Sequence, residues 1–594
     1  AAAKKSYGKK GDAVVQMNWK AIDAGLDAVH KVEVPASWSN PAADPAPKAL
    51  KGPDALVKQI RDIMEPIARM DGDSLPVSAF EGNVNGEWEQ GASAYEKRGT
   101  AVMVPEWDAE KCIQCNQCAF VCSHATIRPF CLTADEAANA PESTKLADTK
   151  PKASEYKFTM AVSPLDCMGC GECVTVCPTK AIEMKPQESQ AAQQAAFDYC
   201  VENIRKKDNI PGVVSDISVK GSQFNQPLLE FSGSCAGCAE TSYARLITQL
   251  FGEKMFISNA TGCSSIWGGT ASISPYTTNK ESGFGPAWIN SLFEDNAEHG
   301  LGMQIGYETV RANLITKVEA LKGKNADLDA VIDKYLETKN NTKANDAPAK
   351  ALIAALEACG CDESKEILKD KQYLAKKSFW IFGGDGWAYD IGYGGLDHVL
   401  ASGHDVNVMV FDTEMYSNTG GQASKASNIG EVCQFAAAGK EISKKSLAEI
   451  CMTYGYIYVA QIALGANMAQ AVKAIAEAEA YPGPSIIIGY APCELHGVKG
   501  GMTNCQNEMK KAVEAGYWNL FTFNPANKAQ GKNPFTLTSK AVDAEKYQAL
   551  LANETRYSRL TRAFPERAKA LFARNEQVAN DRYEHLTRLV ELYK

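Results

Sequence analysis

The chain has 594 residues, a formal net charge of −9 and 45% apolar residues. This length is enough for several domains, and the apolar fraction can fill several hydrophobic cores. The acidic balance argues against a nucleic-acid surface, and no basic stripe with interleaved aromatic residues runs along the chain. The most apolar stretches, such as residues 485–493, are far shorter than the roughly 18 to 20 residues that a membrane-spanning helix requires. We therefore expect a multidomain protein that has neither nucleic acid nor a membrane as its partner.

The first residues contain neither an initiator methionine nor the apolar centre of a signal peptide. This predicts that the chain is not exported and that it is a piece of a longer protein. The chain has 19 cysteines, and most of them fall into ligand patterns rather than a disulfide framework. We therefore expect the protein in the reducing cytoplasm.

In chain order, the first expected element is an amphipathic helix over residues 4–33, followed by a connection rich in proline. The prolines of this connection are Pro35, Pro41, Pro45 and Pro47. We expect residues 1–50 to be the end of a preceding domain and a linker. Residues 51–104 are expected to form a small linking domain, and residues 105–208 a ferredoxin-like domain in which the cysteines crowd into two similar groups.

Both cysteine groups read C-x2-C-x2-C-x3-C, the spacing of bacterial two-cluster ferredoxins. The first group is Cys112, Cys115, Cys118 and Cys122, and the second is Cys167, Cys170, Cys173 and Cys177. In that arrangement the fourth cysteine of each run binds the other cluster. This pairs Cys112, Cys115 and Cys118 with Cys177, and Cys167, Cys170 and Cys173 with Cys122, as ligands of two 4Fe-4S clusters. Zinc is the alternative, although zinc sites favour two separated pairs over tight groups of four.

From residue 209 to the end we expect an α/β domain with a parallel sheet, so that the whole chain is a multidomain α/β and α+β protein. Four apolar runs are expected to be buried parallel strands. They are residues 378–382, 406–411, 456–462 and 485–488. Residues 314–375 have charged and apolar residues at helical spacing, which predicts a helical insertion. The charged tail over residues 541–594, with Pro565 interrupting it, is expected to be a helical arm that packs on a partner subunit or domain.

Two loops after neighbouring expected strands contain residues suited to bind a metal ion. The first reads Gly383-Gly384-Asp385-Gly386, and the second runs from Asp412 to Gly421. Gly-Asp-Gly alone is also an ordinary turn. However, parallel α/β sheets bind ligands beyond the carboxyl ends of their strands, and Mg²⁺ needs oxygen ligands in near-octahedral geometry. Asp385, Thr413 and the Met415 carbonyl fit a magnesium ion that holds a diphosphate.

These loops, GGDGWAYDIGYGGLDH and DTEMYSNTGGQASKAS, resemble the thiamine-binding domain of the pyruvate:ferredoxin oxidoreductase family, within the 2-oxoacid:ferredoxin oxidoreductases. The segments KKSYGKKGDAVV, AYEKRGTAVMVPEW and GKNPFTLTSK extend the resemblance over nearly the whole chain. It implies thiamine diphosphate with Mg²⁺ as cofactors. The residues that it places at the cofactor are Gly384, Asp385, Gly386, Thr413, Met415 and Asn418. Asn418 would also face the substrate as a catalytic residue. Thr261 and Ser264 lie beside Cys263 in the sequence, and we expect them to touch cofactor or substrate. We expect His496 to support these residues rather than to act as an acid-base catalyst.

Four further cysteines, Cys235, Cys238, Cys263 and Cys493, are scattered along the α/β domain. Taken alone, Cys235 and Cys238 fit a redox dithiol or half a zinc site. The resemblance implies instead that all four hold a third 4Fe-4S cluster beside the thiamine, which takes electrons one at a time. Cys433 is the competitor for the fourth ligand. We favour Cys493 because it follows an expected parallel strand, whereas Cys433 lies in a helix-like stretch where a buried thiol is usually packing. The remaining cysteines show no pattern.

The resemblance implies oxidative decarboxylation of pyruvate with coenzyme A to acetyl-CoA and CO₂, with electrons passing to ferredoxin or flavodoxin. It also implies a homodimer of the complete protein and an N-terminal half that supplies the thiamine-activating glutamate, the main pyruvate contacts and part of the coenzyme A site. We therefore expect that this chain alone does not catalyse the reaction. The alternatives are a relative that acts on another 2-oxoacid and a pure electron-transfer module that rests on the ferredoxin-like pair.

Overall fold

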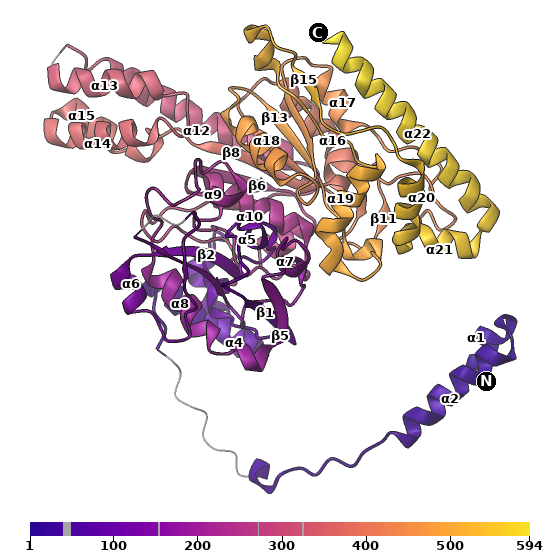
Figure 1. Ribbon diagram of the computed structural model, residues 1–594. Helices are drawn as coiled ribbons and strands as arrows, with labels where there is room; N and C mark the ends of the chain where they lie inside the picture. Colours follow the sequence, from indigo (N-terminus) through magenta and orange to yellow (C-terminus); the bar gives the residue numbers. More distant parts are fainter. Residues whose placement is uncertain (40–48, 152–154, 271, 324–325) are drawn as a thin grey trace. The chain divides into compact units, whose positions relative to one another are not determined.

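The computed structural model of the protein describes residues 1–39, 49–151, 155–270, 272–323 and 326–594. The chain divides into two compact units, Ala1–Pro53 and Asp54–Lys594 (Figure 1). The first unit contains α1 (Ala2–Tyr7) and α2 (Asp12–Asp27) instead of one continuous helix. Gly11 separates the two with a φ of 98°, which a right-handed helix cannot contain. Pro35 follows these helices, and Pro41, Pro45 and Pro47 lie outside the described residues.

The second unit begins with short helical segments that reach Tyr95. They are α3 (Asp54–Gln59), the π-helical turn η3 (Ile60–Met64) and α4 (Glu65–Ala68), followed by 3₁₀ turns. Gln59 fixes this segment to the rest of the unit, because its amide donates to the Ser272 carbonyl at 3.2 Å and accepts from the Glu89 N–H at 2.9 Å.

The cysteine-rich segment forms two small antiparallel sheets with short helices between them. The strands are β1 (Met103–Trp107), β2 (Ile127–Leu132), β3 (Ala147–Asp148), β4 (Lys157–Val162) and β5 (Ile182–Pro186). β1 pairs with β5, and β4 pairs with both β2 and β3. The connecting helices are α5 (Gln117–Val121), α6 (Ala134–Ala138) and α7 (Glu172–Thr175), and α8 (Gln193–Asn203) and α9 (Val219–Ser222) follow. The core is small and centred on edge-to-face contacts of Phe158 with Trp107 and Phe224.

An eight-stranded sheet in the order β15-β14-β12-β13-β9-β8-β6-β7 forms the centre of the α/β part. Its strands are β6 (Met255–Asn259), β7 (Ala287–Asn290), β8 (Ser378–Gly384), β9 (Asn407–Asp412), β12 (Tyr458–Ile462), β13 (Ser485–Tyr490), β14 (Phe521–Phe523) and β15 (Phe535–Leu537). The pairs from β12 to β7 are parallel, whereas β14 and β15 join as antiparallel strands. All four expected strands are therefore confirmed as members of the parallel part of this sheet.

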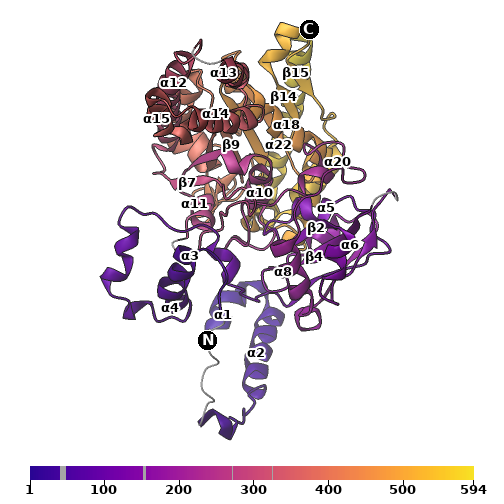
Figure 2. The same cartoon turned by 90° about the vertical axis from the view of Figure 1, so that its left-hand side faces the viewer.

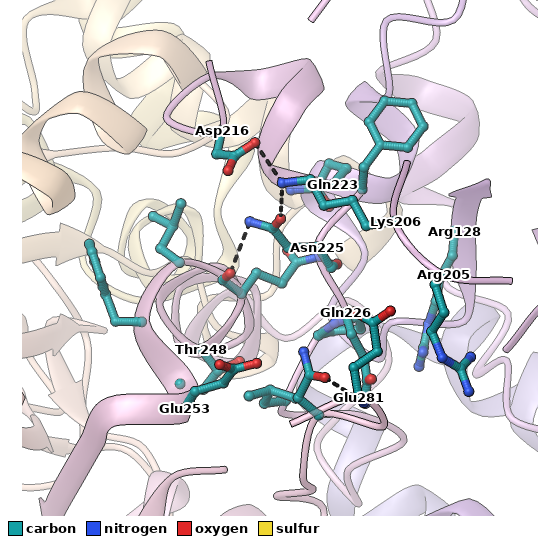
Figure 3. Close-up of a pocket in the computed structure, with 18 of the residues that line it drawn as sticks. Arg128, Arg205, Lys206, Asp216, Gln223, Asn225, Gln226, Thr248, Glu253 and Glu281 are labelled. Carbon is teal, nitrogen blue, oxygen red and sulfur yellow. Dashed lines mark hydrogen bonds and ion pairs between the residues drawn. The ribbon is translucent and has the colours of Figure 1, made fainter. Parts of the chain in front are cut away.

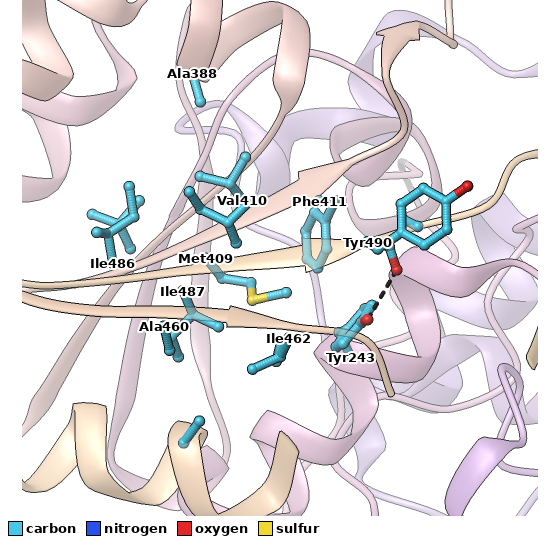
Figure 4. Close-up of a cluster of buried hydrophobic side chains, with 14 of the residues drawn as sticks. Tyr243, Ala388, Met409, Val410, Phe411, Ala460, Ile462, Ile486, Ile487 and Tyr490 are labelled. Carbon is cyan, nitrogen blue, oxygen red and sulfur yellow. Dashed lines mark hydrogen bonds between the residues drawn. The ribbon is translucent and has the colours of Figure 1, made fainter. Parts of the chain in front are cut away.

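Both faces of this sheet are buried, which explains why its strands are almost continuously apolar. Figure 4 shows Val410 and Ile486 on one side of the strands, and Met409 and Ile487 on the other. Tyr243 of α10 (Ala239–Phe251) covers the second side. The other helices around the sheet are α11 (Cys263–Gly268), α16 (Tyr393–Ala401), α17 (Leu447–Met452), α18 (Met468–Ala480) and α19 (Cys505–Ala515).

The helical insertion starts earlier than the sequence predicted. Its helices are α12 (Asn296–Glu319), α13 (Ala326–Thr338), α14 (Asp346–Cys359) and α15 (Asp362–Leu368) (Figure 1). The first part of α12 packs on β6 and β8, whereas the rest of the insertion has its own core with Leu314, Ile332 and Leu352. The beginning of α12 packs against the sheet, whereas the insertion was recognised by charged residues at helical spacing. The prediction therefore missed this part.

The C-terminal tail packs on its own domain, unlike the arm that the sequence suggested. It consists of α20 (Ala544–Asn553), α21 (Thr555–Ala563) and α22 (Pro565–Leu592). Leu560 and Leu571 of this tail share a core cluster with Ile429 and Val432. Pro565 occupies the first turn of α22, where its missing N–H is harmless, and α21 ends at Ala563, so the helical tail is interrupted here as the sequence predicted. Of the described helices, none is long and apolar enough to cross a membrane. Figure 2 shows the insertion helices α12, α13, α14 and α15 grouped together in a second view.

Candidate functional site

The carboxyl ends of four neighbouring parallel strands gather the predicted site residues at one edge of the sheet. Asp385 follows β8, Thr413 follows β9, and Cys493 follows β13 by three residues. Cys263 begins α11, a few residues after the end of β6. Since β13, β9, β8 and β6 are consecutive in the sheet, residues from distant parts of the chain meet here.

The predicted magnesium ligands converge around the buried Asp385 carboxylate. The Thr413 N–H and hydroxyl donate to one of its oxygens at 3.1 and 2.8 Å, and the Ser424 hydroxyl donates to the other at 2.6 Å. The Thr413 hydroxyl also lies 3.0 Å from the Met415 carbonyl oxygen. Burial and the neighbouring Asp412 raise the pKa of Asp385 well above its usual range. A hard divalent cation held by these oxygens would offset both the loss of hydration of the buried Asp385 carboxylate and its repulsion by Asp412. The donor set therefore fits Mg²⁺.

The two glycines beside Asp385 differ in what they permit. A Cβ on Gly386 would lie 2.6 Å from the Tyr416 ring, so packing within the chain requires glycine there. A Cβ on Gly384 would meet only the Phe411 carbonyl oxygen, at 3.8 Å. The space beside Gly384 agrees with the expectation that a cofactor lies close to this backbone.

A buried network of charges behind the magnesium loop was missed by the sequence reasoning. Lys444 contacts the carboxylates of Asp412 at 2.8 Å and Glu414 at 3.0 Å, and Arg556 contacts the other Glu414 oxygen at 2.9 Å. Burial alone would raise the pKa of Glu414, but Lys444 and Arg556 outweigh it and lower the pKa to about 2. The one signal in the sequence was Glu414, an acidic residue close to the end of an expected buried strand. Because a buried carboxylate needs a cationic partner, this residue could have indicated a buried lysine or arginine nearby.

The four scattered cysteines line one cavity of about 150 Å³ next to the magnesium loop. Its lining includes Cys235, Cys238, Cys263 and Cys493, together with Thr413, Ser417 and Asn418 of the second loop. Cys433 is not among the lining residues. Its sulfur is buried 4.0 Å from the Ser427 hydroxyl, and its backbone forms a bridge with Ala436 instead of the helix that the sequence suggested. This geometry supports Cys493 as the fourth ligand of the third cluster.

His496 connects the two loops. Its Nδ1 accepts a hydrogen bond from the Cys493 N–H at 3.4 Å, and its Nε2 lies 2.7 Å from the Thr413 carbonyl oxygen. Burial, followed by the charge of Arg556, lowers the pKa of His496 to about 3. The imidazole is therefore neutral, with Nε2 donating to Thr413. This arrangement supports the interpretation that His496 positions both loops.

Of the remaining candidates, only Asn418 lies at the cavity, whose lining also includes Cys263. Thr261 donates to the Ser291 carbonyl at 3.3 Å, and the buried Ser264 accepts from the Asn259 amide at 2.9 Å. Neither residue lines the cavity. The expectation that Thr261 and Ser264 touch cofactor or substrate therefore gains no support.

The cysteines of the ferredoxin-like segment fall into the two crossed groups that the spacing predicts. Cys112, Cys115, Cys118 and Cys177 line one small cavity. In the other group, burial and then repulsion by neighbouring sulfurs, Cys122 included, raise the pKa of Cys167 to about 11. Burial and then the neighbouring Glu172 carboxylate raise the pKa of Cys170, whereas burial and then neighbouring sulfurs raise the pKa of Cys173. Within the described ranges, no group of three His, Cys, Asp or Glu residues is arranged to hold a single metal ion.

Comparison with known proteins identifies the family. A model described as "4Fe-4S dicluster domain" matches residues 111–181, and "Thiamine pyrophosphate enzyme, C-terminal TPP binding domain" matches residues 367–488. Pyruvate-flavodoxin oxidoreductase from Klebsiella pneumoniae is 48% identical, covering 99% of this chain and 50% of the relative. Pyruvate:ferredoxin oxidoreductase from Moorella thermoacetica is also 48% identical, with the same coverage. The chain belongs to the pyruvate:ferredoxin and pyruvate-flavodoxin oxidoreductase family.

The family assignment makes 4Fe-4S clusters and thiamine diphosphate the cofactors of this chain. The chain spans about half the length of these curated relatives and 32% of a mitochondrial pyruvate dehydrogenase [NADP(+)] from Euglena gracilis that is 44% identical. Residues 46–101 match a domain of unknown function. Among solved structures, a 2-oxoglutarate:ferredoxin oxidoreductase from Magnetococcus marinus matches with 15% identity and a TM-score of 0.27, covering 44% of this chain and 64% of that one, a likeness too low to support an inference.

A second, roomier cavity of about 350 Å³ contains none of the predicted site residues. Figure 3 shows Lys206 between Asp216 and Asn225 at this cavity, with Arg128 and Arg205 farther along its wall. Lys206 contacts both neighbours, at 2.7 and 2.9 Å. The lining mixes charges of both signs, many of them paired within the chain, so it selects no single class of ligand.

Proposed function

We propose that this chain is the half of a pyruvate:ferredoxin or pyruvate-flavodoxin oxidoreductase that holds thiamine diphosphate and three 4Fe-4S clusters. The complete enzyme would convert pyruvate and coenzyme A to acetyl-CoA and CO₂ and pass two electrons to ferredoxin or flavodoxin. The single observation that carries this proposal is the cavity in which Cys235, Cys238, Cys263 and Cys493 meet Thr413 and Asn418. It supports a redox cluster directly beside the cofactor loop.

Bound thiamine diphosphate would supply the carbanion-stabilising chemistry that allows CO₂ to leave a 2-oxoacid. In this chain, Asp385, Thr413 and the Met415 carbonyl would hold the Mg²⁺ of the diphosphate. Asn418, at the cavity wall, would orient the substrate beside the cluster cysteines. His496 would hold the loop of Cys493 and the loop of Thr413 in fixed positions relative to each other by its two hydrogen bonds.

Contacts between the two domains support an order for the clusters. Ser123, which follows Cys122, lies 3.3 Å from Ser242 of α10, and His124 Nε2 lies 3.2 Å from the carbonyl oxygen of Ser234, beside Cys235. The cluster of Cys122, Cys167, Cys170 and Cys173 would therefore receive electrons from the third cluster, which lies beside the thiamine and is called the thiamine-side cluster below. The group of Cys112, Cys115, Cys118 and Cys177 would pass them outward, because the intervening Ile113 is exposed and gives an acceptor a place to dock.

The remaining parts of the proposal follow from relatives about twice as long as this chain. An N-terminal half would supply the glutamate that activates thiamine, the main pyruvate contacts and part of the coenzyme A site. The complete protein would be a homodimer. A cytoplasmic location stays a prediction from cysteine usage.

The test is pyruvate- and coenzyme A-dependent reduction of ferredoxin or flavodoxin, measured anaerobically. The enzyme assembled from both halves is expected to reduce the acceptor, whereas this chain alone should bind thiamine diphosphate without turnover. A panel of 2-oxoacids decides the substrate, since the substrate-selecting contacts are assigned to the other half. Preference for a different 2-oxoacid would replace pyruvate in the proposal. Absence of thiamine diphosphate binding would leave a pure electron-transfer module.

A further inference from the structure

Two cysteines in the helical insertion are independent of the cofactor sites. Cys359 is the last residue of α14, and Cys361 directly precedes α15. Gly360 lies between them with a φ of 62°, a left-handed conformation that glycine adopts without strain. This turn places the two sulfur atoms 3.1 Å apart. A displacement of about one ångström would bring them to the length of a disulfide bond.

This pair is accessible where other thiols are not. Outside the proposed cluster ligands, the remaining cysteines are Cys131, Cys200, Cys433, Cys451 and Cys505, and all five are buried. Cys359 is exposed and Cys361 is partly exposed. A small reagent in solution can therefore reach Cys359 and Cys361 without any unfolding of the domain cores.

The surroundings of the pair favour thiol chemistry. The Ser364 hydroxyl lies 3.1 Å from the Cys361 sulfur. Hydrogen bonding with Ser364, and then with Cys361, lowers the pKa of Cys359 below its usual range, so more of it is thiolate at neutral pH. Cys361 packs at the edge of the core of the insertion, which holds one end of the pair in place.

We propose that Cys359 and Cys361 form a redox-active dithiol site that exchanges with low-molecular-weight disulfides of the glutathione type. The Cys359 thiolate attacks one sulfur of the disulfide, forms a mixed disulfide and releases one small thiolate. The Cys361 thiolate then attacks the Cys359 sulfur, closes the intramolecular bond and releases the second small thiolate. The protein loses two electrons and two protons, and the small disulfide becomes two thiols. Because only one residue separates the cysteines, the closed ring is strained and easily reduced again.

The test uses the anaerobically prepared full chain with its clusters, treated with excess oxidised glutathione. Free thiols are then alkylated, and the peptide with both cysteines is weighed by mass spectrometry. The wild-type peptide is expected to lose two hydrogens, to carry no glutathione and to return to the dithiol with excess reduced thiol. Cys361→Ser should instead trap glutathione on Cys359, because the resolving thiol is gone.

Cys451→Ser is the matched control, since Cys451 is buried in α17. Its oxidised yield should equal that of the wild type, and the iron content of every variant should remain unchanged. Stable glutathione on wild-type Cys359, without ring closure, would overturn the proposal. So would a pair that stays fully reduced at an excess of oxidised glutathione, or a Cys361→Ser variant that still loses two hydrogens.

Discussion

Asp385 is the residue on which the proposed cofactor site depends most. Its carboxylate is buried, and within the described part of the chain it contacts hydroxyl and amide donors but no lysine or arginine. We expect Asp385→Ala to weaken Mg²⁺-dependent thiamine diphosphate binding by at least about tenfold, roughly 1.4 kcal/mol, while the iron content stays unchanged. Calorimetry with and without Mg²⁺ measures this effect.

Asp390→Asn is the control for that experiment, because Asp390 pairs with the exposed Lys425 at 2.9 Å. Its cofactor affinity should stay close to that of the wild type. Equal affinity of the wild type and Asp385→Ala would refute the magnesium assignment.

The fourth ligand of the thiamine-side cluster gives the second prediction at this scale. Cys493 lines the cavity with the other three cysteines, whereas Cys433 is packed beside Ser427. Cys493→Ala is therefore expected to lose about four iron atoms, those of one cubane. Cys433→Ala should retain them all. Iron analysis of both variants decides the point, and a structure with iron bound to Cys433 would contradict it.

At the residue scale, the sequence was informative wherever a side chain follows a strand. Asp385, Thr413 and Cys493 could be predicted to meet because each comes after a parallel strand. Lys444 and Arg556 could not, because their partner Glu414 lies far from both in the sequence. Thr261 and Ser264 were expected to touch cofactor or substrate because they lie beside the loop of Cys263; they do not line the cavity, and their contact with a cofactor stays a prediction.

At the scale of elements, α21 connects the C-terminal tail to the magnesium loop through the buried Arg556. This guanidinium contacts Glu414, Glu431 and Glu554 at 2.9, 3.2 and 2.6 Å. Arg556→Met would leave Glu431 and Glu554 without their cation and Glu414 with Lys444 alone, so it should cost about 3–5 kcal/mol of unfolding free energy. Arg562→Met, on the exposed side of the same helix, should cost less than about 0.5 kcal/mol. Denaturant unfolding compares the two, and equal stabilities would contradict the structural role of Arg556.

For the helical insertion we expect a substitution to change local stability without affecting the cofactor site. Ile332 is buried in a core that the insertion forms by itself. Ile332→Ala should therefore cost about 2–5 kcal/mol locally, and amide hydrogen exchange should accelerate in α13 to α15. Thiamine diphosphate affinity should stay unchanged. A parallel loss of affinity would show that the insertion supports the cofactor site.

The sequence predicted elements well where they are buried and uniform. The apolar runs that became β8, β9, β12 and β13 were recognised because both sheet faces are covered. The strands β6 and β7 were missed because polar residues such as Ser258 and Asn290 interrupt them. Pro565 was expected to interrupt the helical tail, and α21 does end at Ala563 before α22 begins at Pro565.

At the scale of the whole molecule, the ferredoxin-like segment and the thiamine-binding domain form one unit whose cofactor sites adjoin. The Thr175 hydroxyl donates to the Thr503 carbonyl at 3.1 Å, and the Gln506 amide donates to Glu172 at 3.3 Å. These contacts fix the second cysteine group near the cavity of Cys235 and Cys493. Sequence spacing predicted the ligands of each cluster, but this proximity follows only from the packed domains.

We propose that this chain holds three cubane clusters, one of them beside the thiamine. Iron and acid-labile sulfide analysis of the anaerobically prepared chain counts these clusters. We expect about twelve iron atoms and about twelve sulfides per chain, because each cubane contains four of each. About eight of each, with both ferredoxin-like groups filled, would mean that Cys235, Cys238, Cys263 and Cys493 hold no cluster, and would contradict the account.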